Sequence, residues 1–220
     1  MANGMPLAEP GSLTTRQGAW GDSLRMVVAP THTFRRIKGR PVWLPPFLLA
    51  VLVRLLHLFT FYSPSLSPAK LTLSVMLEVL PFLIPVLICS GVFFLGLLLI
   101  GAKPCFSRVF SVLTHTFFLY TVLTVGLGSI VLLVAPHPEL LDRTDLVAAN
   151  LGPLIDGQEH LALHHLVRSI DLVSLYQLYL IALGLSITSE GVSLRAGLWL
   201  VGNTWALYVA GGVAIKVAVS

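Results

Sequence analysis

Five long apolar stretches, separated by polar connections, dominate the pattern of this chain. They lie at approximately 42–62, 80–100, 109–135, 170–188 and 196–215. A helix needs about 20 residues to cross roughly 30 Å of hydrocarbon, so each stretch is near or above that length. The pattern predicts an all-α integral membrane protein, in which residues 42–218 form a bundle of five transmembrane helices.

The N-terminal part has a different pattern. Residues 1–21 mix Gly, Pro, Ser and Thr without periodicity, which predicts a flexible cytoplasmic tail. Residues 22–41 combine apolar and basic side chains, which predicts a basic interfacial segment of one or two short amphipathic helices on the membrane, apolar side down. Its membrane-surface or docking residues are Arg25, Arg35, Arg36, Lys38 and Arg40. The alternative is that these cations only anchor the first span from the inside.

Composition supports the membrane class. Apolar residues make up 55% of the chain and charged residues 11%, with a mean hydropathy of +0.86, which excludes an ordinary water-soluble domain. The two cysteines, Cys89 and Cys105, cannot form a disulfide framework or a CxxC metal site. Walker and GxSxG motifs are missing from the sequence, so we expect a non-enzymatic protein without a cofactor.

The basic residues predict an orientation. With the N-terminus inside, nine cations lie on the inner side and four on the outer side, which favours a cytoplasmic N-terminus, an outer C-terminus and an acidic outer loop at 136–168. We therefore expect the cytoplasmic (inner) membrane or, in a eukaryote, the endoplasmic reticulum or Golgi membrane. Nucleic acid is not an expected partner, because the positive charge follows the membrane topology. The inner set is the six cations before residue 41 plus Lys103, Arg108 and Arg195; the outer set is Lys70, Arg143, Arg168 and Lys216.

Ionisable residues in or beside the apolar stretches are the sharpest candidates for a site. Arg54 and His57 share one helix face, and Glu78 and Asp171 lie at the outer ends of two other spans. We expect these four residues to form one intramembrane polar network in the outer half of the bundle, since charges at membrane depth need partners. One alternative is that the network only locks helix packing, or that Glu78 and Asp171 simply meet water and head groups at the interface. The other is a polar cavity, open to the outside, that binds an ion, a proton or a lipid head group.

Three further features have structural interpretations. His115 and Asn203 are candidate polar residues of the core. His160 and His164 have the i, i+4 spacing of weak zinc ligands, but the HExxH order is missing; an outward-facing metal enzyme using both with Asp171 is the least favoured hypothesis. Small residues are expected at close helix contacts within the bundle: Gly126, Gly128, Gly184, Ala210, Gly211 and Ala214.

Three stretches resemble the Yip family of five-helix membrane proteins. Residues 30–43, with Pro30, Phe34, Ile37 and Trp43, are similar to the family's approach to the first helix. Residues 101–115 resemble its turn between the second and third helices. Residues 169–185 resemble its fourth helix, with an Asp, aromatic residues and Leu-Ala-Leu-Gly. The likeness covers roughly 25–215 and is closer to the bacterial-type domain, because eukaryotic members usually have longer N-terminal regions.

This resemblance implies five helices with the N-terminus inside and a role in organising membranes. We expect a non-enzymatic protein that interacts with other membrane proteins or lipids, its partners being anionic lipid head groups at the N-terminal segment and a membrane protein or a second copy in the bilayer. The alternative function is a small transporter, or a lipid- or ion-handling protein, that works through the outer polar layer.

Overall fold

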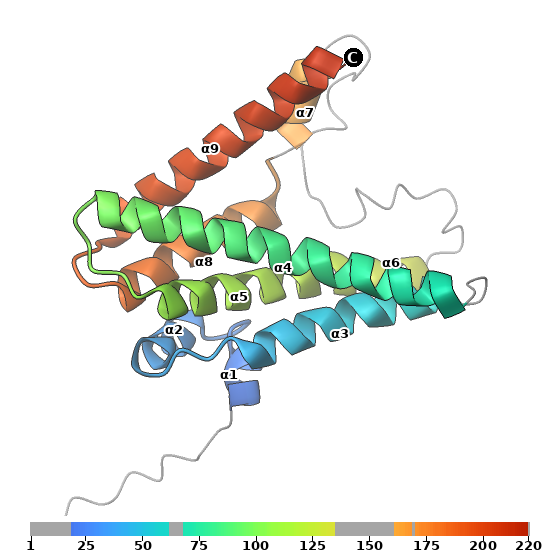
Figure 1. Cartoon of the computed structure of the whole chain (residues 1–220), viewed down its shortest axis with the longest axis horizontal. Helices are drawn as coiled ribbons and strands as arrows, with labels where there is room; N and C mark the ends of the chain where they lie inside the picture. The colour runs from blue at the N-terminus through green and yellow to red at the C-terminus, as the bar shows by residue number, and fades with distance from the viewer. Residues whose placement is uncertain (1–18, 62–67, 135–160, 169, 220) are drawn as a thin grey trace, which may run out of the picture.

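The computed structural model of the chain describes residues 19–61, 68–134, 161–168 and 170–219 (Figure 1). Every regular element in these ranges is a helix. In chain order the elements are α1 (Ala19–Arg25), α2 (Pro30–Gly39), α3 (Leu44–Phe61), α4 (Pro68–Leu99), α5 (Phe106–Thr121), the π-helical turn η2 (Val122–Gly126), α6 (Leu127–Val134), α7 (Leu161–Arg168), α8 (Leu172–Thr188) and α9 (Leu194–Val219).

Three helical stretches are long and apolar enough to cross a membrane: Thr72–Leu99, Phe106–Val134 and Leu194–Lys216. The second of them is continuous through α5, η2 and α6. Two further apolar helices, Leu44–Thr60 and Leu172–Thr188, are shorter. Helices suit a lipid environment because they satisfy their backbone hydrogen bonds internally. The chain is therefore a helical membrane protein.

The second apolar stretch is longer as a helix than the sequence pattern indicated. Its helix, α4, begins at Pro68 and continues through Pro81 and Pro85 to Leu99. The sequence analysis began this span at Leu80, beside the first internal proline. Proline removes one helical hydrogen bond, but membrane helices tolerate this loss because neighbouring helices support the freed backbone groups.

The bundle is arranged around α5. Eleven of its 16 residues are buried, because α3 and α4 pack against it on one side and α8 packs on another. The helix α9 packs mainly on α8 and has few contacts with α4. In Figure 1 the red α9 leans away from the green α4 along its length, and α7 lies beside its C-terminal part. The core is thus centred on α5, and α9 is the least buried of the three described helical stretches that are long enough to cross a membrane.

Two short connections lie side by side at one end of the bundle. The connection after α4 and the connection after α8 form an isolated antiparallel bridge, in which the Lys103 amide donates to the Glu190 carbonyl at 3.4 Å. Each turn uses a glycine with positive φ, Gly101 at 78° and Gly191 at 81°, a conformation that other residues rarely adopt. Because of this bridge, α5 and α9 begin at the same end of the bundle. We call it the bridge end.

The segment before α3 folds onto the bundle. Thr33, Phe34 and Ile37 of α2 are buried, and α2 packs against α8 and α5. The sequence analysis expected this apolar side to face lipid. It faces protein instead, because the ends of α5 and α8 offer a large apolar surface that covers Phe34 completely.

Glycine permits the closest of these contacts. A Cβ on Gly184 of α8 would lie 2.5 Å from Val112 Cγ1 and 2.9 Å from Phe34 Cε1, so α2, α5 and α8 meet at this point. Gly128 is also buried. The prediction of bundle contacts was wrong for Ala210, Gly211 and Ala214, which are exposed, because α9 leans away from α4 along its second half.

Candidate functional site

The predicted polar layer contains one ion pair. Arg54 Nε donates to Glu78 Oε2 at 3.2 Å, and the two side chains are 23% and 28% exposed. The pair links α3 to α4, which also pack against each other along their length. Pairing at membrane depth offsets the cost of placing each charge away from water. The ion pair therefore links the two helices.

His57 lies one turn beyond Arg54 and bonds a different helix. Its Nδ1 lies 2.8 Å from Ser129 Oγ of α6. Because the Ser129 hydroxyl donates to the Val125 carbonyl at 2.6 Å, the hydrogen bond requires His57 Nδ1–H as the donor. The π-helical turn η2 immediately precedes this contact and packs against α3. Thus α3 is fixed to α4 by an ion pair and to α6 by a hydrogen bond.

The structure places Asp171 away from these contacts, at the start of α8. Its Oδ1 accepts from the Ser174 amide at 2.8 Å and its Oδ2 accepts from the Ser174 hydroxyl at 2.5 Å. Asp171 is thus the N-cap of α8, where a carboxylate also interacts favourably with the helix dipole. The structure brings Arg54 and Glu78 together, whereas Asp171 belongs to a separate group of side chains.

That separate group lines a cavity of about 720 Å³ between α4, α5, α8 and α9. Its walls are mainly apolar, with a few polar side chains. Tyr120 lies near both Asp171 and Ser174. The polar and aromatic lining residues are Phe93, Phe117, Tyr120, Asp171, Ser174, Gln177, Thr204, Trp205 and Tyr208. We call this space the Asp171 cavity.

His115 lies in the core, 1% exposed. Its Nδ1–H donates to the Ser111 carbonyl at 2.8 Å, since a carbonyl can only accept. Ser111 in turn donates its hydroxyl to the Val42 carbonyl at 2.7 Å, which fixes the chain just before α3. This residue therefore stabilises the bundle near the bridge end.

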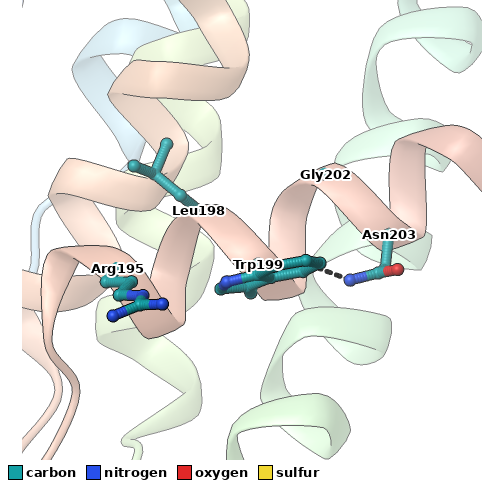
Figure 2. A pocket seen from close by; sticks show the side chains of 5 residues that line it. All are labelled: Arg195, Leu198, Trp199, Gly202 and Asn203. Atoms are coloured by element: carbon teal, nitrogen blue, oxygen red, sulfur yellow. Dashed lines mark hydrogen bonds between the residues drawn. The ribbon is translucent and has the colours of Figure 1, made fainter.

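Asn203 was expected in the core, and this prediction was wrong. It is exposed on α9, where its amide nitrogen donates to the Trp199 carbonyl at 2.7 Å, four residues earlier. Figure 2 shows Asn203 and Trp199 along one side of α9, with Arg195 one turn further toward the N-terminus. The physical reason is that α9 packs on α8 through Gly197, where a Cβ would lie 2.8 Å from the Ala182 carbonyl oxygen. Asn203 therefore lies on the other side of the helix.

A shallow pocket of about 470 Å³ follows this side of α9, lined by Arg195, Leu198, Trp199, Gly202 and Asn203 (Figure 2). Small residues continue it at intervals of four, at Ala206, Ala210 and Ala214, all of them exposed. Residues four apart lie on one helix face. We call this surface, from Arg195 to Ala214, the outward face of α9.

The predicted N-terminal cations lie at the bridge end. Arg35, Lys38 and Arg40 are exposed. Arg36 forms an ion pair of 2.5 Å with Asp22 of α1, and Arg25 is partly buried in the last turn of α1. The same end carries Lys103 in the connection before α5, Arg108 in the first turn of α5 and Arg195 in the first turn of α9, so the bridge end is strongly basic.

The weak metal candidates cannot be placed. His160 and the side chain of His164 lie outside the described residues, as do the tail before Ala19 and most of the acidic loop. Within the described ranges, no three His, Cys, Asp or Glu side chains come together as a metal site.

Comparison of the chain with models of protein families, with curated proteins and with solved structures found no match. Two features escaped the sequence analysis: the aromatic and amide lining of the Asp171 cavity, and the outward face of α9. The sequence signals that could have revealed them are Gln177 for the cavity and Trp199 for the outward face, because both residues are unusual in apolar helices.

Proposed function

We propose that this chain is a non-enzymatic, multi-pass membrane protein that associates laterally with other membrane proteins through the outward face of α9. The observation that carries the proposal is the exposure of Asn203 and Trp199 on a helix apolar enough to cross the membrane. Trp199 is 65% exposed. Among the described residues, the hydrogen bond that Asn203 forms stays within α9, where its amide donates to the Trp199 carbonyl.

The chemistry of this face suits helix association in lipid. Apolar side chains give no hydrophobic driving force between helices there, so association depends on close packing of small residues and on polar side chains. The repeat Gly202, Ala206, Ala210 supplies the close approach, and Asn203 supplies an interhelical hydrogen bond. Trp and Arg are enriched among residues that dominate binding energy, and the face carries Trp199 and Arg195.

The proposed topology has five spans with the N-terminus in the cytoplasm, as the Yip-type resemblance implies. The shorter helices α3 and α8 would be the first and fourth spans, since both are apolar and both pack against α5. The basic bridge end supports this orientation, and Arg35, Lys38 and Arg40 would attract anionic head groups. In a bacterium the location would be the inner membrane.

A photocrosslinker on α9 tests the proposal. In a Cys89→Ser/Cys105→Ser background, Ala206→Cys is labelled with a benzophenone maleimide in native membranes and irradiated. Gly212→Cys is the matched control, because Gly212 is also exposed and small but points to a different side of α9. We expect an adduct of defined mass from position 206 alone. A mass of two chains identifies a homo-oligomer, and another mass identifies a different protein.

A bulky side chain provides the second half of this test. Ala206→Ile should abolish the partner's co-purification in mild detergent, whereas Gly212→Ile should not, since only the first change blocks close helix approach. Equal adducts from both positions, or co-purification unaffected by Ala206→Ile, would contradict lateral association through this face.

The second candidate function is a small transporter or a lipid- or ion-handling protein. The Asp171 cavity favours it, because a volume of about 720 Å³ lies within the range of roughly 300 to 1,000 Å³ typical of ligand sites. The test is substrate flux into proteoliposomes. Flux that survives Asp171→Asn unchanged would remove this candidate.

A further inference from the structure

We propose that the Asp171 cavity binds a phospholipid with an ammonium head group, with the ammonium at Asp171 and an acyl chain between α4 and α9. The inference deepens the second candidate function, because it names the ligand of that cavity. Binding and transport are measured separately, so a lipid that binds without being moved would retain the inference and remove only the transporter.

The negative charge at the polar end of the cavity specifies a cation. Both oxygens of Asp171 accept from Ser174, whose amide and hydroxyl are neutral donors. The ion pairs that the described residues form, Arg36 with Asp22 and Arg54 with Glu78, do not include Asp171. A carboxylate at the edge of the hydrocarbon is costly without a positive partner. A ligand with a positive charge would therefore bind most favourably next to the Asp171 carboxylate.

Aromatic side chains make the polar end suitable for an ammonium group. Tyr120, Trp205 and Tyr208 line the cavity together with Asp171. The faces of Tyr and Trp rings attract cations, and this effect is the common basis for recognising substituted ammonium groups. A carboxylate combined with aromatic rings therefore favours an alkylammonium over a metal ion.

A second polar requirement lies deeper in the cavity. The amide nitrogen of Gln177 is buried and has no hydrogen-bond partner in the described structure, and Gln177 lines the cavity. A buried donor without an acceptor costs about 1 to 3 kcal/mol. Gln177 is six residues beyond Asp171, which is about 9 Å along a helix. The ligand should therefore carry an acceptor oxygen at that distance from its ammonium, as the ester region of a phospholipid does.

The remaining walls of the cavity are apolar and accommodate an acyl chain. Beyond Gln177 the cavity continues along Ile181 of α8, Ile88 and Val92 of α4, and Val201 of α9. These apolar residues lie between α4, α8 and α9, on the side of Gln177 that is nearer the bridge end. The order of ammonium, acceptor oxygen and hydrocarbon along α8 matches the order of groups in a phosphatidylethanolamine or phosphatidylcholine.

Native mass spectrometry of the delipidated full chain in maltoside micelles tests the assignment. The probes are dioleoyl phosphatidylethanolamine, its N-acetyl derivative without the positive charge, dioleoyl phosphatidylglycerol, and chain-free glycerophosphoethanolamine. We expect dioleoyl phosphatidylethanolamine to bind at least tenfold more tightly than either its N-acetyl derivative or dioleoyl phosphatidylglycerol. Equal binding of all three lipids overturns the inference. Equal binding of glycerophosphoethanolamine overturns the lipid assignment in favour of a water-soluble amine.

Variants locate the binding. Asp171→Asn should abolish the preference for the ammonium lipid, and Gln177→Leu should weaken binding severalfold. Glu190→Gln is the matched control, because it removes an exposed carboxylate at the bridge end, beyond the far end of α8. A preference that survives Asp171→Asn overturns the inference. Because the comparison of lipids on the unmodified chain needs no variant, a folding defect in Asp171→Asn cannot hide the result.

Discussion

The guanidinium of Arg54 and the carboxylate of Glu78 meet at 3.2 Å between α3 and α4, with about a quarter of each side chain exposed. The two residues are 24 positions apart in sequence, and their ion pair joins α3 to α4, the two helices that precede α5. Removing one partner leaves the other charge in an apolar setting, whereas removing both leaves no uncompensated charge.

The first prediction is a double-mutant cycle on this pair. Arg54→Gln and Glu78→Gln should each lower the free energy of unfolding by about 1 to 3 kcal/mol, a range reduced for the partial exposure of the pair. The double variant should lose less than the sum of the two. Reversible unfolding in mixed micelles measures the effect, with Arg40→Gln as a control for a cation at an exposed position. Strictly additive losses would mean that the pair does not couple α3 to α4.

A second prediction concerns the junction of α2, α5 and α8. Gly184→Ala should destabilise the bundle by about 1 to 3 kcal/mol, because the new methyl group would overlap Val112 and Phe34. Gly91→Ala is the control, since nothing lies within 4 Å of a Cβ at that helical position. Thermal unfolding monitored by circular dichroism should show a lower midpoint for Gly184→Ala alone. Equal midpoints would show that the three helices are not in close contact.

The third prediction tests how α2 is held. Phe34→Ala should cost about 3 to 5 kcal/mol if the ring is as fully enclosed as the structure shows. It should also accelerate trypsin cleavage after Arg35, Lys38 and Arg40, because α2 then detaches more often from α5 and α8. The control is Val28→Ala, at a position that is 81% exposed. Unchanged stability and cleavage would instead support a helix that lies on lipid.

Cys105 supplies a natural probe of orientation. It is exposed in the connection between α4 and α5, so under the proposed topology a membrane-impermeant maleimide should label it only from the cytoplasmic side. Ile215→Cys, near the other end of α9 and 66% exposed, should be labelled from the outside in a Cys89→Ser/Cys105→Ser background. The reverse pattern would place the N-terminus outside.

The same thiol predicts a pH dependence. The hydrogen bond with the Ser107 hydroxyl, 3.2 Å long, is the main cause that lowers the pKa of Cys105 below the ordinary value for a thiol. A lowered pKa means more thiolate at neutral pH and faster reaction with maleimide. Ser107→Ala should therefore move the midpoint of the rate against pH upward, measured in the Cys89→Ser background. An unchanged midpoint would exclude this hydrogen bond as the cause.

Much of the fold could be predicted because hydrophobic pattern and length act locally. The apolar stretches gave helices at nearly the predicted positions for α3, α8 and α9. The start of α4 was missed because proline is a poor guide to helix ends in membrane spans. The π-helical turn between α5 and α6 has no local sequence signal of its own.

The sequence by itself determined the membrane class, the approximate helices and the collection of cations near one end, since composition and spacing suffice for these. Only the tertiary structure decided which polar residues meet. It paired Arg54 with Glu78 but placed Asp171 in a cavity with Tyr120 and Gln177, because α3 and α8 pack on different sides of α5. It also turned Asn203 outward. The buried face of a uniformly apolar helix depends on which helices pack against it. The hydrophobic pattern of a single sequence does not predict that face.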